Sequence, residues 1–199
     1  MNTPLSHVVS ELKIGGPVYS QTGDTSCWST ALRTAALWLA NDDVEHVIVA
    51  GGEEFDPVFL DVMHSARWFG SRPEAGVSEG AGAVLLGKKS SQALAHITRI
   101  VDGFAFRNRA QAAMAAESLL AEFDPVIPVA DTAANWTRRL AAKPLSGRML
   151  SNCCGVPKFE AFTATCAWNT IRAVHSAEPR LVVPFLGLSQ QMGAIEIFR

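Results

Sequence analysis

Apolar positions along the chain alternate between short continuous runs and longer stretches with helical periodicity. Residues 27–40, CWSTALRTAALWLA, are apolar on most faces, which predicts a buried helix. Residues 46–50, HVIVA, form a continuous run rich in β-branched residues, which predicts a fully buried strand in a parallel pairing. A short strand is predicted just before the helix, over residues 17–22, PVYSQT.

The remainder of the chain continues this alternation of strands and helices. Further strands are predicted at residues 81–87, 96–106, 125–130, 180–187 and 192–198. Further helices are predicted at residues 57–69, 109–123, 133–142 and 158–175, with a loop over residues 70–80. This order is typical of an α/β protein in which helices cover a buried sheet. Neither GxGxxG after the first strand nor GxxxxGK[ST] occurs, which disfavours nucleotide binding.

Composition and charge narrow the class of protein. The chain has 199 residues, of which 48% are hydrophobic and 18% charged, so it can bury a large core. The net charge of −2 gives no indication of a nucleic acid or an anionic membrane as partner. No apolar run approaches the roughly 18 residues of a transmembrane helix, and residues 1–12 lack the pattern of a signal peptide. We therefore expect a cytoplasmic protein.

The four cysteines do not form a recognisable metal or disulfide pattern. Cys153 and Cys154 are adjacent, Cys166 falls on a predicted helix, and Cys27 stands alone. This spacing fits no zinc site, and a disulfide framework is not expected in a domain of this size. We expect no metal and no cofactor.

The tetrapeptide Asp24-Thr25-Ser26-Cys27 places a cysteine at the start of the first long helix, directly after a predicted strand. The unpaired N–H groups of a helix N-terminus carry about +0.5 of a charge, which favours a thiolate there. A thiolate at a strand-to-helix turn is a ready nucleophile, suited to covalent chemistry on an acyl group. The alternative is that Cys27 is a small buried core residue, the common fate of a reduced cysteine.

Three motifs in order resemble the β-ketoacyl synthases of the thiolase superfamily. They are the GDTSCW turn at Cys27, the pair Gly51-Gly52 after the next strand, and Glu79-Gly80-Ala81-Gly82 before the following one. Residues 143–155, KPLSGRMLSNCCG, resemble a stretch of the chain-length-factor subunits that accompany polyketide ketosynthases. Residues 185–198 resemble the closing glycine-rich loop and its flanking strands, so the resemblance spans about residues 15–199.

The resemblance implies an α/β thiolase-like layered sandwich that is N-terminally truncated. In that family two βαβαβαββ units are joined, and most of the first unit precedes the cysteine. Here residues 1–90 would hold the remainder of the first unit with the nucleophile turn, and residues 91–199 the second, reduced unit. Members of the family pair through the strand before the cysteine, so residues 17–22 imply a homodimer or a heterodimer with a ketosynthase-like chain.

The resemblance also assigns roles at the site. Cys27 would be the nucleophile, and the backbone N–H groups of Cys27 and Leu188 would form the oxyanion hole. The two histidines that condensing members use are missing, since the matching stretches are VADTA at 129–133 and SGR at 146–148. The five histidines present are more typical of structural or exposed positions, with His64 the one of most interest as a candidate. Glu79 is expected to order backbone amides. Glu53-Glu54 could serve as a carboxylate pair, but a solvated strand end is the favoured interpretation.

Three functions remain open on this sequence. The first is a β-ketoacyl synthase-like acyltransferase of fatty-acid or polyketide biosynthesis, which takes an acyl chain from the phosphopantetheine of acyl carrier protein onto Cys27 for Claisen-type condensation. The second is a non-catalytic, chain-length-factor-like partner that shapes the acyl tunnel of a ketosynthase. The third is a fragment without a function of its own. The missing histidines leave open whether the protein is an enzyme.

Overall fold

The computed structural model describes residues 3–23, 25–65, 76–88, 90–131, 147–152, 159–187 and 191–199. The helices are α1 (Thr3–Glu11), α2 (Cys27–Ala40), α3 (Pro57–Ser65), α4 (Arg109–Ala121) and α6 (Phe162–Val174). The strands are β1 (His46–Glu53), β2 (Gly76–Val77), β3 (Gly80–Gly87), β4 (His96–Ala105), β5 (Val129–Ala130), β6 (Leu150–Ser151), β7 (Phe159–Glu160), β8 (Arg180–Leu186) and β9 (Gln191–Phe198).

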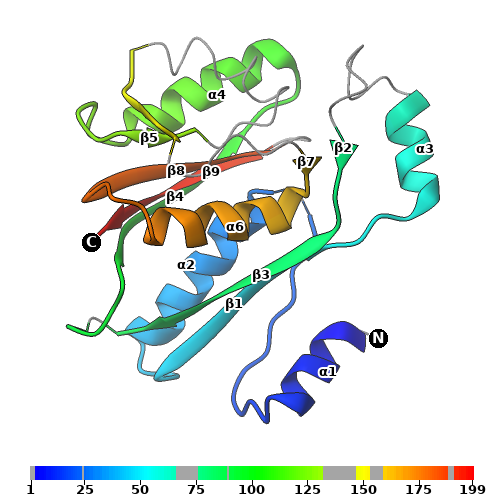
Figure 1. Cartoon of the computed structure of the whole chain (residues 1–199), viewed down its shortest axis with the longest axis vertical. Coiled ribbons are helices and arrows are strands. Elements are labelled where there is room, and N and C mark those ends of the chain that lie inside the picture. The colour runs from blue at the N-terminus through cyan, green and yellow to red at the C-terminus, as the bar shows by residue number, and fades with distance from the viewer. Residues whose placement is uncertain are drawn as a thin grey trace.

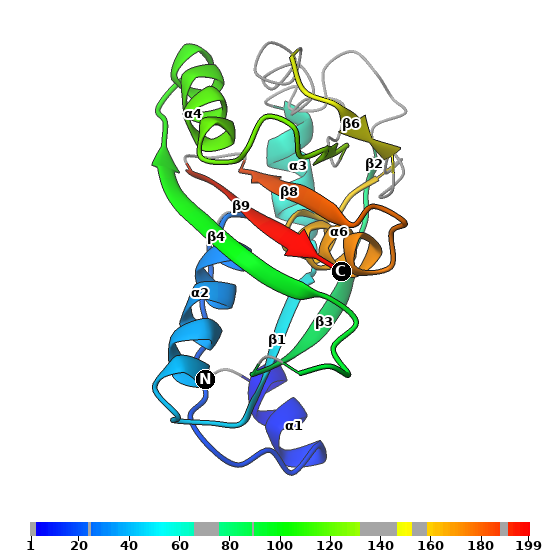
Figure 2. The ribbon, with the colours of Figure 1, turned by 90° about the vertical axis from the view of Figure 1, so that its left-hand side faces the viewer.

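The elements stack in layers (Figure 1). A five-stranded sheet has the order β4-β9-β8-β5-β6, with β4, β9 and β8 antiparallel and β5 parallel to both β8 and β6. Helix α4 covers one face of this sheet, and α2 and α6 cover the other. The antiparallel pair β1–β3 lies on the far side of α2 and α6, which therefore form the middle layer between two sheets (Figures 1 and 2).

The closing strands β8 and β9 are found where the sequence predicts strands, and both are buried on both faces. Val183 and Ile195 face α2 and α6 in one core cluster, whereas Val182 and Met192 face α4 in the other. All four side chains are fully buried. Successive side chains of a strand point to opposite faces, so a strand between two helical layers is apolar at most positions. Glu196 of β9 is the buried exception, and its carboxylate is paired with Arg180 at 2.7 Å.

The strand β1 differs from its prediction in both pairing and burial. It pairs antiparallel with β3, with Gly51 opposite Gly82, and the predicted parallel pairing is wrong. Its burial alternates along the strand, with Val49 buried and Ile48 44% exposed, so the predicted full burial is also wrong. The reason is that one face of β1 packs on the middle layer, while the other face and one edge border a cavity.

Two other predictions on the N-terminal part need correction. Residues 17–22 belong to no strand, because no described strand lies beside them to complete a ladder. The helix over residues 27–40 has the predicted bounds, but it is not buried all round. Leu32 is fully buried, whereas Leu37 is 56% exposed, because only one side of α2 meets the five-stranded sheet and α6.

The other helices and strands predicted within the described residues are found with shifted ends, and the strand β2 lies inside the loop predicted at residues 70–80. The helix expected at 57–69 is described as far as Ser65, and the strand expected at 125–130 is reduced to Val129–Ala130. Residues 159–160 form a short strand where a helix was expected to start, and α6 begins at Phe162. The helix predicted at 133–142 lies outside the described residues.

The Glu79-Gly80-Ala81-Gly82 motif packs closely against helix α6. The Trp168 indole lies against Gly80 and donates a hydrogen bond from Nε1 to the Ala81 carbonyl at 2.9 Å. A Cβ on Gly82 would come within 2.8 Å of the Ala167 Cβ. The carboxylate of Glu79 accepts a hydrogen bond from the Phe55 N–H at 3.0 Å, which confirms the amide-ordering role predicted for it. The glycines thus allow α6 to approach β3 closely.

We predict that Gly80→Ala destabilises the protein by about 1–3 kcal/mol, the range typical of overpacking a tight contact. A methyl group at Gly80 would collide with the Trp168 ring and push α6 away from β3. Urea unfolding followed by circular dichroism measures the change. Gly15→Ala is the matched control, since a Cβ there meets no atom within 4 Å. Equal stability of the two variants would contradict the close packing of α6 on Gly80.

Candidate functional site

Cys27 is the first residue of α2, where the sequence predicts it. The two residues before it, Thr25 and Ser26, are buried at 6% and 1% exposure, whereas Cys27 is half-buried. Neither Cys27 nor Cys166 forms a disulfide. Asp24, Cys153 and Cys154 lie outside the described residues. The thiol therefore lies at a helix N-terminus, at the outer limit of the core.

The core holds the turn before Cys27 through its backbone carbonyls. Cys166 Sγ, on α6, donates to the Thr25 carbonyl at 3.6 Å, and the Trp28 N–H donates to the same carbonyl at 3.1 Å. Ser29 Oγ donates to the Ser26 carbonyl at 2.7 Å. These contacts fix the backbone on both sides of Cys27.

The closing strand β9 also contacts this turn. Ser26 makes no side-chain capping bond to α2 and instead donates from Oγ to Gln191 Oε1 at 3.3 Å. Gly193 packs directly on Ser29, with no room between them for a Cβ. Leu188, the predicted second oxyanion donor, lies outside the described residues. Gln191, the first described residue after it, is thus next to the nucleophile turn.

Gly23 also lies against the thiol of Cys27. A Cβ on Gly23 would lie 2.6 Å from Cys27 Sγ, so any residue other than glycine at this position would displace the sulphur. Sequence reasoning did not single out Gly23, although its place four residues before the cysteine was a possible signal. The contacts through Gln191 and Cys166 had no such signal.

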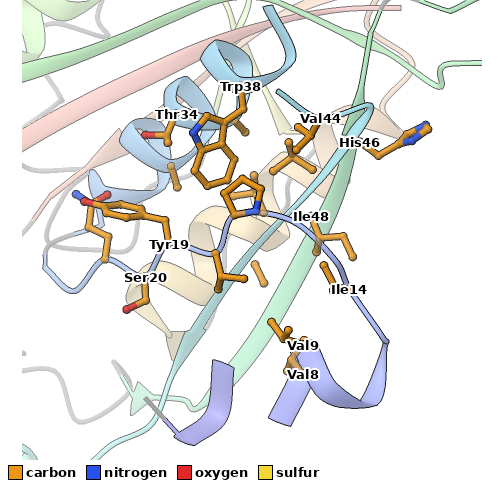
Figure 3. Close-up of a pocket in the computed structure, with 18 of the residues that line it drawn as sticks. Val8, Val9, Ile14, Tyr19, Ser20, Thr34, Trp38, Val44, His46 and Ile48 are labelled. Carbon is orange, nitrogen blue, oxygen red and sulfur yellow. The ribbon is translucent and has the colours of Figure 1, made fainter. Parts of the chain in front are cut away.

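The described histidine rings lie away from Cys27. His46 begins β1, while Gly51 packs on Trp28 beside Cys27, so about five residues of strand, roughly 17 Å, separate them. His46 is exposed and its ring points away from the cavity (Figure 3). His96 pairs with Phe198 at the end of β9 opposite to Gln191.

Two more histidines are also distant or exposed. His175 caps the C-terminus of α6, whereas Thr163 at the start of that helix packs on Gly51. His7 lies exposed on α1, outside the cavity lining, and the His64 side chain lies outside the described residues. No histidine whose side chain is described therefore takes the place of a base beside Cys27.

Asp131 and Arg148 are described residues in the two stretches that, by resemblance, match the histidine turns of condensing enzymes. Asp131, at the carboxyl end of β5, is buried and its N–H donates to the Ser151 carbonyl. Arg148 donates to the carbonyls of Leu120, Phe123 and Asp124 at 2.6–3.1 Å. The bond to Leu120 satisfies a carbonyl in the last turn of α4, and the other two hold the residues that follow the helix, so Arg148 serves as a helix cap.

Glu53 stands at the end of β1, where the N-terminus of α6 meets the sheet. Burial raises the pKa of its carboxyl group above 4.5, and hydrogen bonds from the Thr163 N–H and side chain oppose this rise. Thr163 also lines the cavity that contains Cys27. The strand end is thus half-buried and bound to α6, and the solvated end predicted for Glu53 is wrong, because its side chain faces the middle layer.

We predict that Glu53 makes stability fall as pH rises. Its raised pKa means that the folded state binds more protons than the unfolded state between the two pKa values. The stability due to Glu53 is full below about pH 4.5 and is lost as pH rises through the folded pKa. Urea unfolding across this range should show wild type losing stability relative to Glu53→Gln. Glu54→Gln, at the exposed neighbour, is the charge-matched control; a pH-independent difference for Glu53→Gln would contradict the prediction.

A cavity of about 280 Å³ lies beside Cys27 (Figure 3). One side of α2 forms its floor, with Ala31 and Trp38, and β1 forms a wall. Residues 14–21 and α1 form the outer wall. The described lining contains no Asp, Glu, Lys or Arg, and Cys27 is its one thiol. Within the described residues no group of three or more His, Cys, Asp or Glu could hold a metal, and no helix is long and apolar enough to cross a membrane.

A layered sandwich with a cysteine at the N-terminus of a middle-layer helix defines a protein with the thiolase-like fold of β-ketoacyl synthases. The ishigamide ketosynthase/chain length factor superposes with a TM-score of 0.77 at 15% identity, over 99% of this chain and 61% of that one. A type II polyketide ketosynthase, in complex with its acyl-carrier protein and bound to the hexaketide, gives 0.68 at 14%, over 97% and 61%. β-Ketoacyl-[acyl carrier protein] synthase III from Thermus thermophilus gives 0.63 at 13%, over 98% and 72%.

These similarities confirm the fold that the motifs predict. The chain spans 61% of the length of the first two of these structures. No family model and no curated protein matches the sequence.

Proposed function

We propose that this protein is a ketosynthase-like acyl acceptor of fatty-acid or polyketide biosynthesis, in which Cys27 receives an acyl chain from acyl carrier protein. The observation that supports this is the position of Cys27. It begins α2, the carbonyls before it are bound by the core, and its side chain borders an apolar cavity.

The transfer is a thioester exchange. Cys27 Sγ, as the thiolate, attacks the carbonyl carbon of the acyl-phosphopantetheine thioester and forms a new S–C bond. The bond to the phosphopantetheine sulphur breaks, and that sulphur leaves as a thiolate that takes up the proton Cys27 lost. The helix N-terminus favours the attacking thiolate. We propose the Cys27 and Leu188 N–H groups as donors to the oxyanion.

The subsequent condensation requires more than this chain's described residues supply. Decarboxylation of a malonyl thioester produces an enolate, and one preorganised hydrogen-bond donor to such an oxyanion is worth about 3–4 kcal/mol. No histidine whose side chain is described lies near Cys27 to act as that donor. We therefore propose that a ketosynthase-like partner chain completes the site.

The test is intact-protein mass spectrometry after incubation with octanoyl-acyl carrier protein. The proposal predicts a mass gain of one octanoyl group, located by peptide mapping on Cys27. A parallel incubation with malonyl-acyl carrier protein should release no carbon dioxide from the isolated chain. Absence of any octanoyl adduct would refute acyl acceptance.

A second candidate is a chain-length-factor-like subunit that shapes the acyl tunnel of a ketosynthase. It is favoured by the lack of a described histidine side chain near Cys27 and by the similarity to the ishigamide ketosynthase/chain length factor. This candidate predicts that the chain co-purifies with a ketosynthase and alters its product length, and that Cys27→Ala does so equally well.

A further inference from the structure

The cavity beside Cys27 extends along helix α2. Cys27 lines it at the first residue of the helix, and Ala31, Thr34, Ala35 and Trp38 line it further along. These residues follow one another at intervals of three or four, so they lie on one side of the helix. From Cys27 to Trp38 the helix advances 11 residues, which is about 16 Å at about 1.5 Å per residue.

Strand β1 gives the second wall of the cavity a similar length. Gly51 packs on Trp28 beside Cys27, since a Cβ on Gly51 would lie 3.1 Å from the indole. From Ala50 back to His46 the strand lines the cavity, and this stretch is about 13 Å long at about 3.3 Å per residue. The helix and the strand therefore border the same space from the thiol to its far end.

Apolar side chains line the cavity at the end away from Cys27. The Asp43 N–H donates to the Trp38 carbonyl at 3.0 Å, so Val44 follows directly after the end of the helix. Gly16 lies against Val44, because a Cβ on it would be 3.9 Å from Val44 Cγ1. Figure 3 shows Trp38 and Val44 together at this end. A chain that starts at the thiol and follows α2 therefore meets the Trp38 indole.

The side chains of the cavity suit an alkyl chain. No Asp, Glu, Lys or Arg is among the described residues that line it. The Thr34 hydroxyl donates to the Thr30 carbonyl at 3.0 Å, so it is bound within its own helix. The ring of His46 points away from the space (Figure 3). Each methylene group that such a site buries favours binding by about fourfold, so a longer alkyl chain binds better until it reaches the far end.

The length of the cavity corresponds to a chain of medium length. An extended alkyl chain advances about 1.3 Å per carbon, because its C–C bonds of about 1.5 Å form a zigzag. We propose that Trp38 sets the length of the acyl chain that Cys27 accepts, with an upper limit of about twelve carbons. In this role, which rests on the proposed acyl acceptance at Cys27, the indole stops the methyl end of the chain. A longer chain leaves its last methylene groups without a buried place.

The test is a series of acyl carrier proteins that bear butyryl, octanoyl, dodecanoyl or hexadecanoyl groups, each incubated with the wild-type chain. Intact-protein mass spectrometry over time gives the rate of adduct formation, and peptide mapping locates the adduct on Cys27. We expect the rate at limiting carrier protein to rise from butyryl to dodecanoyl and to fall about tenfold or more for hexadecanoyl. Equal rates for dodecanoyl and hexadecanoyl would overturn the length limit and leave acyl acceptance intact, whereas no adduct with any group would refute acyl acceptance and the limit with it.

Trp38→Ala tests the residue at the far end. It should bring the hexadecanoyl rate to within about threefold of the dodecanoyl rate, because the longer chain then finds a buried place. Leu37→Ala is the matched control, since Leu37 is exposed on the same helix and outside the cavity lining, and it should keep the wild-type limit. An unchanged limit in Trp38→Ala would overturn the role of Trp38. Circular dichroism shows whether the variant is folded; if it is not, Trp38→Leu takes its place with the same expectation.

Ala31→Leu tests the path of the chain. Ala31 lies one helical turn beyond Cys27, about 6 Å along the cavity floor, so a larger side chain there stops an acyl chain after about four or five carbons. The octanoyl rate should fall about tenfold or more relative to the butyryl rate. Ala36→Leu, at an exposed position of α2 outside the lining, should keep the wild-type ratio. Equal ratios in the two variants would place the acyl chain elsewhere and overturn the proposal.

Discussion

Cys27→Ala is expected to abolish acyl loading from octanoyl-acyl carrier protein. The sulphur is the proposed nucleophile, and it is the one thiol among the described residues that line the cavity. Alanine keeps the helix start and removes only the sulphur, so the fold should persist while the mass gain disappears. Intact-mass spectrometry of wild type and variant under identical conditions measures the loss.

Cys166→Ala provides the matched control for this experiment. Cys166 is only 4% exposed and its thiol is bound to the Thr25 carbonyl, so it cannot reach a carrier-bound thioester. This variant should keep the octanoyl adduct and lose about 1 kcal/mol or more of stability, because it gives up a buried hydrogen bond and packing. An adduct that persists in Cys27→Ala would place the acyl group elsewhere and refute the role of Cys27.

Trp28→Ala is expected to cost about 3–5 kcal/mol of stability, the range for removing a large buried aromatic side chain. Trp28 is 1% exposed and follows Cys27 directly in α2. Its Nε1 donates to Thr170 Oγ1 on α6 at 2.9 Å, so the indole joins the two middle-layer helices. The loss is a large share of the 5–15 kcal/mol typical of a domain. Urea unfolding at equilibrium measures it.

Leu37→Ala, on the exposed side of the same helix, is the matched control. Leu37 is 56% exposed, so its truncation should change stability by less than about 0.5 kcal/mol. Trp28→Phe separates packing from hydrogen bonding, since it keeps most of the apolar volume but leaves Thr170 without the indole donor. A cost for Trp28→Ala no greater than that for Leu37→Ala would contradict the joining role.

The sequence predicted elements best where burial follows from local pattern. The bounds of α2 are those predicted, and β8 and β9 were recognisable because both faces of these strands are covered. The pattern of β1 was misleading. Several of its apolar residues border the cavity, so the continuous apolar run did not mean that other elements cover the strand. Whether β1 pairs parallel or antiparallel depends on β3, which begins 27 residues after β1 ends.

At the site, too, the features set by neighbouring residues could be predicted, whereas the contacts between residues far apart in the sequence could not. The place of Cys27 at a helix start was visible in a tetrapeptide, and the Gly80 motif was visible as a match to a family. The contact of Ser26 with Gln191 joins residues 165 positions apart, and no local pattern predicts it. The partners of the cysteine turn could therefore be found only from the folded chain.

The middle layer has a consequence for how the chain is made. Helix α2 leaves the ribosome before its partners, because Thr170, which binds Trp28, follows 142 residues later, and Gln191, which binds Ser26, later still. At a synthesis rate of about 5–20 residues per second, on the order of ten seconds separates the helix from its partners. During that interval the apolar face of α2 and the Cys27 thiol have no finished core to pack against. A nascent chain stalled before β9 would present both to chaperones.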